Sequence, residues 1–267
     1  MKIYVPHFKR LEETFKDREE LVFYNALGPL REVCGGRGSG DIAHSVLPTI
    51  DDLKQLSERL GERFQLLANG SFPVYTPRVK KVCEILERNH SSITVSRLRF
   101  AQEIKNDIPN MAIGASCIMS FYRPFPEIMA SGLFDRVCAP QFWNYNIQQM
   151  CDNVPQEMRH RVYYIVNSPC VWSMGCRNHY EVMSATYTYQ NQPFQLEVTW
   201  PATCRRKAHV PTIDWGRGVF EQLFDNGFTV FKFQGRDKPV EILEARLKEA
   251  FDYADKAAAK STTQAVL

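Results

Sequence analysis

Short apolar, β-rich runs alternate along this chain with segments whose apolar residues recur at helical spacing. Each run is bounded by turn or charged residues, as is typical of strands buried in a parallel sheet. The predicted strands are residues 2–6, 21–27, 64–69, 93–96, 111–117, 136–140, 161–166 and 228–233. The predicted helices are residues 8–19, 51–60, 77–89, 97–107, 125–132, 145–154, 219–226 and 239–259.

Strands that are each followed by a helix predict an α/β fold, a single (β/α)₈ TIM-like barrel with some irregularity. The alternative that this pattern leaves open is a doubly wound open sheet. Two long excursions, residues 28–48 and 167–217, each follow a strand, so a barrel would carry both as loops on its functional rim. We expect one barrel domain over residues 1–260 and a frayed tail over residues 261–267.

Composition narrows the class of protein. Hydrophobic residues make up 44% of the 267 positions and charged residues 24%, so the chain can bury a substantial core. The net charge of +3 is too small to indicate nucleic-acid binding by itself. No apolar run approaches the roughly 20 residues that span a bilayer, and the N-terminus has no apolar signal-peptide core. We therefore expect a cytoplasmic protein without a membrane span.

The eight cysteines separate into two sets. A cytoplasmic chain of this size does not need a disulfide framework, so buried thiols are expected to be packing residues. Apolar surroundings assign this role to Cys83, Cys117, Cys138 and Cys151. The other set lies on the two long loops and consists of Cys34, Cys170, Cys176 and Cys204. Four thiolates are the usual ligands of a [4Fe–4S] cluster, so this set predicts a cluster site.

Other interpretations of the loop cysteines stay open. Cys170, Cys176 and Cys204 with His179 would supply a Cys₃His zinc site, although their spacing is wider than that of a zinc knuckle. His179 could instead act in catalysis or hydrogen-bond to the site. Cys–His catalysis through Cys176 is a third interpretation. A serine nucleophile is not indicated, because the chain has no Gly-x-Ser-x-Gly elbow.

Basic residues of the last strand and the first loop suggest anion binding. Lys232 and Gln234 share one face of the last strand, which in a barrel is the interior, where an unpaired ammonium is costly. Arg236 follows at the rim, and Arg37 lies in a glycine-rich loop. Lys232 and Arg236 are therefore predicted catalytic residues together with His179. The predicted substrate-binding residues are Arg37, Asn69, Ser116 and Asn167.

Three motifs resemble the collagenase-like peptidase family of unknown catalytic type, family thirty-two. The segment from Cys170 to Cys176 is similar to the family's Cys-x₄-Gly-x-Cys hallmark but is one residue shorter. Phe-Lys-Phe-Gln-Gly-Arg, residues 231–236, resembles its last barrel strand, with Gln234 in place of the family's Glu. Cys34-Gly-Gly-Arg37 resembles a loop of members that assist anaerobic ubiquinone hydroxylation.

The resemblance implies a barrel and, for several members, a [4Fe–4S] cluster on four cysteines. It implies oxygen-independent hydroxylation, or a related redox modification, of a small aromatic or quinone precursor, a nucleobase of tRNA or rRNA, or a peptide. Prephenate is the implied oxygen donor, and a homo- or heterodimer with a related barrel protein is the implied assembly. The alternatives are a peptidase, or a non-catalytic cluster-binding subunit of a heteromeric hydroxylase.

Overall fold

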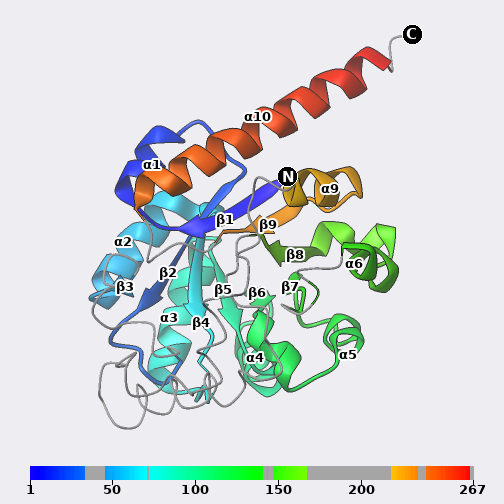
Figure 1. The fold of residues 1–267 in the computed structure, drawn as a ribbon. Helices are drawn as coiled ribbons and strands as arrows, with labels where there is room; N and C mark the ends of the chain where they lie inside the picture. The colour runs from blue at the N-terminus through cyan, green and yellow to red at the C-terminus, as the bar shows by residue number, and fades with distance from the viewer. Residues whose placement is uncertain are drawn as a thin grey trace, which may run out of the picture.

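The computed structural model describes residues 1–33, 46–70, 72–140, 143, 147–166, 218–233 and 239–264. In this part of the chain, parallel strands close into a barrel with helices on its outside (Figure 1). Around the ring, the strands are β1 (Lys2–Pro6), β2 (Leu21–Leu27), β4 (Phe64–Ala68), β5 (Ser92–Val95), β6 (Ala112–Ala115), β7 (Arg136–Cys138), β8 (Val162–Ile165) and β9 (Val230–Lys232). Because β1 pairs with both β2 and β9, the sheet has no open seam, which confirms the predicted barrel over the open sheet.

Helices follow the strands on the outside of the barrel. They are α1 (Lys9–Thr14), α2 (Ile50–Leu60), α3 (Pro77–Arg88), α4 (Leu98–Asp107), α5 (Phe125–Ala130), α6 (Ile147–Asn153), α9 (Val219–Asp225) and α10 (Val240–Gln264). The short 3-10 helices are η2 (Gly61–Arg63), η3 (Cys117–Phe121) and η5 (Gln156–Arg161). Two starts are fixed by side chains: the hydroxyls of Thr49 and Thr76 accept the backbone N–H groups of Asp52 and Val79.

The observed helices and strands differ from the sequence prediction by more than two residues at two helix ends, and one strand was not predicted. Helix α1 ends at Thr14 rather than near residue 19, because Phe15 leaves helical geometry and the charged segment after it forms turns. Helix α10 continues to Gln264, past the predicted end near residue 259. A two-residue strand, β3 (Val46–Leu47), pairs in parallel with the last two residues of β2 and was not predicted.

The period of two along each strand separates two apolar layers. Alternate residues such as Ile3, Phe23 and Phe231 face outward and belong to the large core between strands and helices. Their neighbours, including Tyr4 and Tyr24, form a second cluster inside the barrel. The interior is therefore filled by side chains, as expected of a barrel of this size.

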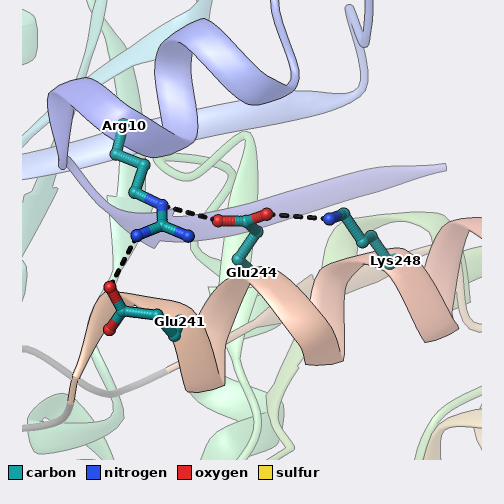
Figure 2. A network of polar contacts seen from close by, with 4 residues as sticks. All are labelled: Arg10, Glu241, Glu244 and Lys248. Carbon is teal, nitrogen blue, oxygen red and sulfur yellow. Dashed lines mark hydrogen bonds and ion pairs between the residues drawn. The ribbon is translucent and has the colours of Figure 1, made fainter.

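Ion pairs join the first helix to the last (Figure 2). Arg10 on α1 bonds through Nη1 to Oε1 of Glu241 at 2.6 Å and through Nε to Oε2 of Glu244 at 2.8 Å. Glu244 also accepts from Nζ of Lys248 at 2.8 Å. Arg10 is about half exposed, so these contacts orient α10 against α1 more than they stabilise the fold.

His7 follows β1 and is mostly buried. Its Nε2 lies 2.8 Å from Oε2 of Glu12, whose other oxygen pairs with Arg59. Burial, assisted by the charge of Arg59, lowers the pKa of His7 to about 4. The imidazole is therefore neutral in the folded protein at neutral pH.

We expect the free energy of unfolding to fall as the pH is lowered from about 6.5 to about 4. In this window an unfolded chain protonates His7 and the folded chain does not, so protons favour unfolding. The contribution of His7 to the free energy of unfolding is complete above about pH 6.5. Roughly 2–3 kcal/mol of this contribution is lost by about pH 4. Urea unfolding of wild type and His7→Gln across this range measures it.

The Gln variant keeps a hydrogen-bonding side chain but does not titrate. It also keeps every carboxylate whose protonation destabilises the fold in acid, so the difference between the two pH profiles isolates His7. Two profiles of the same slope between about pH 6.5 and 4 would show that the folded His7 titrates normally.

The lengths and hydropathy of the helices bear on membrane association. None of those in the described ranges is long and apolar enough to cross a membrane.

Candidate active site

The carboxyl ends of the barrel strands converge on one mouth, where enzymes of this architecture carry out their chemistry. Lys232 is the last residue of β9 and pairs in register with Ile165, the last residue of β8. Cys138 ends β7, one strand further along, and its thiol is close enough to Lys232 for the charge of the lysine to affect it. The mouth therefore combines an ammonium group with a thiol.

Lys232 points into the barrel, as the alternation along the last strand predicted. The side chain is buried, with 8% of its surface exposed. Its Nζ lies 4.5 Å from the ring centroid of Tyr24 on β2 and 5.7 Å from that of Tyr163 on β8. Both distances are within the range of a cation–π interaction.

The two tyrosine rings are held in place by their hydroxyl groups. Tyr24 donates to the backbone carbonyl of Phe233 at 2.7 Å, and Tyr163 donates to that of Ala115 at 2.8 Å. These bonds reach across strands that are far apart in sequence. Because both hydroxyls donate hydrogen bonds inside the barrel, the two rings are held in fixed positions beside the ammonium group.

Two thiols lie next to these rings. Cys117 begins η3, one residue after β6, and its thiol lies close enough to that of Cys138 to affect the pKa of Cys138. Burial raises the pKa of Cys138 well above its usual value, contact with Cys117 adds to the shift, and Lys232 opposes it. Burial likewise raises the pKa of Tyr163. At neutral pH, Cys138 and Tyr163 are therefore uncharged, so neither neutralises Lys232, and Cys138 is a poor nucleophile.

Two predicted substrate-binding residues also lie at strand ends. Asn69 follows β4 and Ser116 follows β6, and both are buried, with 5% and 4% of their surface exposed. The hydroxyl of Ser116 accepts the N–H of Ile118 at 3.3 Å and so caps η3. A structural role therefore accounts for Ser116, and Asn69 places a buried amide at the same end of the barrel.

Most of the predicted site lies outside the described residues. This applies to Arg37, Asn167, His179 and Arg236, and to the four predicted cluster ligands Cys34, Cys170, Cys176 and Cys204. Within the described ranges, no group of three or more His, Cys, Asp or Glu side chains could hold a metal ion. The predicted cluster therefore depends on the two long loops.

Sequence reasoning missed the residues that surround Lys232. Cys117 and Cys138 were predicted to be packing residues together with Cys83, and all three are buried, while Cys151 is partly buried. Two of them nevertheless line the barrel interior beside the lysine. Tyr24 and Tyr163 were not singled out, although alternation places each on the inward face of its strand.

A buried cation at the mouth of the barrel suits one kind of chemistry. An ammonium group seated on neutral aromatic rings attracts a carboxylate or phosphate more strongly than a solvated lysine does. The neighbouring thiols and phenols can donate hydrogen bonds without adding negative charge. The described mouth therefore offers a positive charge and hydrogen-bond donors, the groups that anion binding requires.

Comparisons with known proteins bear on the fold. No family model matches the chain, and no curated protein matches it either. A solved structure described as that of the U32 peptidase Mk0906 is similar over 89% of this chain and 94% of its own, with a TM-score of 0.52 and 13% sequence identity. The similarity therefore shows a fold shared with a U32 peptidase.

Proposed function

We propose that this chain is an enzyme that binds an anionic substrate or co-substrate at the carboxyl-terminal mouth of its barrel. The observation that carries the proposal is the buried ammonium of Lys232, seated on Tyr24 and Tyr163 where barrel enzymes bind their ligands. A carboxylate bound there would exchange water for a charge-assisted hydrogen bond.

The reaction class we favour is cluster-dependent, oxygen-independent hydroxylation or a related redox modification. The sequence supports this reaction class, because Cys34 follows β2 and three further cysteines follow β8, namely Cys170, Cys176 and Cys204. Both strands end at the mouth, so a [4Fe–4S] cluster held by these residues would lie near Lys232. Such a cluster supplies one-electron transfer when bound.

In this proposal each residue of the described mouth has one role in binding the oxygen donor. Lys232 holds the carboxylate of the oxygen donor, with prephenate as the candidate, and the Tyr24 and Tyr163 rings keep the ammonium group in place. Cys117 and Cys138 stay protonated beside it. Arg236 and Arg37 are proposed to add positive charge at the rim. The modified substrate would be a small aromatic or quinone precursor, a nucleobase or a peptide.

The shared fold supports a peptidase as the second candidate, because the similar solved structure is described as a peptidase. The described cysteines do not favour a thiol mechanism, since burial keeps Cys138 protonated. A peptidase would therefore depend on residues of the long loops. A third candidate is a cluster-binding subunit that is active only with a related barrel protein.

We expect protein purified without oxygen to be brown, with an absorbance band at about 400 nm. It should also contain bound iron and sulfide. The Cys176→Ala variant should lose the iron, because one of four thiolate ligands is missing. The matched control is Cys83→Ala, which removes a thiol buried in α3 whose pKa is raised to about 12, and which should keep the iron. Iron and sulfide analysis of the three proteins measures this.

Equal iron in the Cys176→Ala and wild-type proteins would contradict the ligand assignment. A colourless wild type that cleaves a fluorogenic peptide would favour the peptidase. A brown protein that becomes active only when a related barrel protein is added would favour the subunit.

A further inference from the structure

A cavity opens at the end of the barrel opposite Lys232. It has a volume of about 500 Å³, within the range of small-molecule sites. Its walls include Lys2, Ser92 and Arg136, which are the first residues of β1, β5 and β7. The cavity therefore occupies the amino-terminal mouth, opposite Lys232.

Packed aromatic side chains separate the two ends of the barrel. Arg136 reaches inward from the floor of the cavity and donates through Nη1 to the hydroxyl of Tyr4. The Tyr4 ring stacks on that of Tyr163, with centroids 5.9 Å apart. Both tyrosines are almost fully buried in the interior cluster, so a ligand in this cavity cannot reach the mouth that holds Lys232.

The cavity carries charges of both signs on different sides of the ring. Glu62 precedes β4 and Glu87 precedes β5, which are neighbouring strands. The cations Lys2 and Arg136 begin β1 and β7, which flank that part of the ring, and Asp135 lies next to Arg136. The walls therefore present carboxylates and cations together, with Glu62 and Glu87 on neighbouring strands and Asp135 beside Arg136.

The cations and carboxylates of this cavity do not form ion pairs with one another among the described residues. Within the described residues, no ion pair joins Lys2 or Arg136 to the three carboxylates. Asp135 accepts the N–H of Ile113 at 2.8 Å, and Lys2 bonds to the carbonyl of Glu19 at 3.4 Å. A ligand of one sign would meet like charges in this cavity, whereas a ligand with both signs could satisfy the two sets together.

We propose that this cavity is a second binding site and that it takes a zwitterionic amino acid. The ligand carboxylate bonds to Arg136 and Lys2, and the ligand ammonium bonds to Glu62 and Glu87. The site is independent of the function proposed for the opposite mouth, because packed side chains lie between them.

Calorimetric titration of the full-length protein with the twenty common amino acids tests the proposal. We expect at least one to bind. Its N-acetyl and its amide derivatives, which each lack one charge, should bind at least about tenfold more weakly, since each loses a charge-assisted hydrogen bond. Glu87→Gln, Glu62→Gln and Arg136→Lys should each weaken binding by a similar factor.

Two controls fix the location. Glu127→Gln removes an exposed carboxylate from α5 and should bind as the wild type does, and so should Lys232→Met at the opposite mouth. If Arg136→Lys fails to fold, the two Gln variants decide the question, because their carboxylates have no hydrogen-bond partner among the described residues. The proposal is overturned by no binding of any amino acid at about 10 mM, by equal binding of the derivatives, or by wild-type binding in both Gln variants.

Discussion

Replacing Lys232 by Met is expected to weaken the binding of prephenate by about ten- to hundredfold. The substitution keeps the volume of the side chain and deletes the ammonium group that lies 4.5 Å from the Tyr24 ring centroid. A hydrogen bond to a charged group contributes roughly 1.5–3 kcal/mol, which corresponds to this range in affinity. Calorimetric titration of wild-type and variant protein with prephenate, under anaerobic conditions, measures the change.

The variant is expected to fold, because methionine has nearly the volume of lysine and packs well against aromatic rings. Thermal melting and iron analysis verify that it does. Lys54→Met is the matched control, since it removes one positive charge from an exposed position on α2 and should leave affinity unchanged. If Lys232→Met melts normally, keeps its iron and binds prephenate as tightly as wild type, Lys232 is not an anion-binding group for this ligand.

The barrel could be predicted because its strands carry a strong local signal. The runs at residues 2–6 and 21–27 coincide with β1 and β2, since each is an apolar segment bounded by charged or turn residues. The boundaries that differ are those where local preference is weak. The charged residues after Thr14 suit a helix or a turn equally, and the two-residue strand β3 is too short to show a period.

The candidate site was only partly predictable, for a physical reason. Alternation places Lys232 inside the barrel, but it does not say which other inward residues lie at the same height. Tyr24 and Lys232 are brought together only by closure of the ring through β1, which pairs with both β2 and β9. The pairing of Cys117 with Cys138 likewise depends on the register of β6 and β7. Such contacts follow from topology, which short sequence patterns do not contain.

Closure of the barrel also explains the position at which we expect the largest loss of stability. Phe231 lies on the outward face of β9, is fully buried, and packs against Phe220 of α9 with ring centroids 4.5 Å apart. Strand β9 joins β8 to β1, so its outer face anchors the last part of the ring to the helices.

Phe231→Ala should therefore lower the free energy of unfolding by about 3–5 kcal/mol, through lost burial and the cavity that remains. Urea denaturation monitored by circular dichroism measures the loss, with Ile242→Ala on α10 as the control. Ile242 is 50% exposed, so its truncation should cost less than about 1 kcal/mol. A loss for Phe231→Ala no greater than that for the control would mean that the outer face of β9 does not hold the barrel closed.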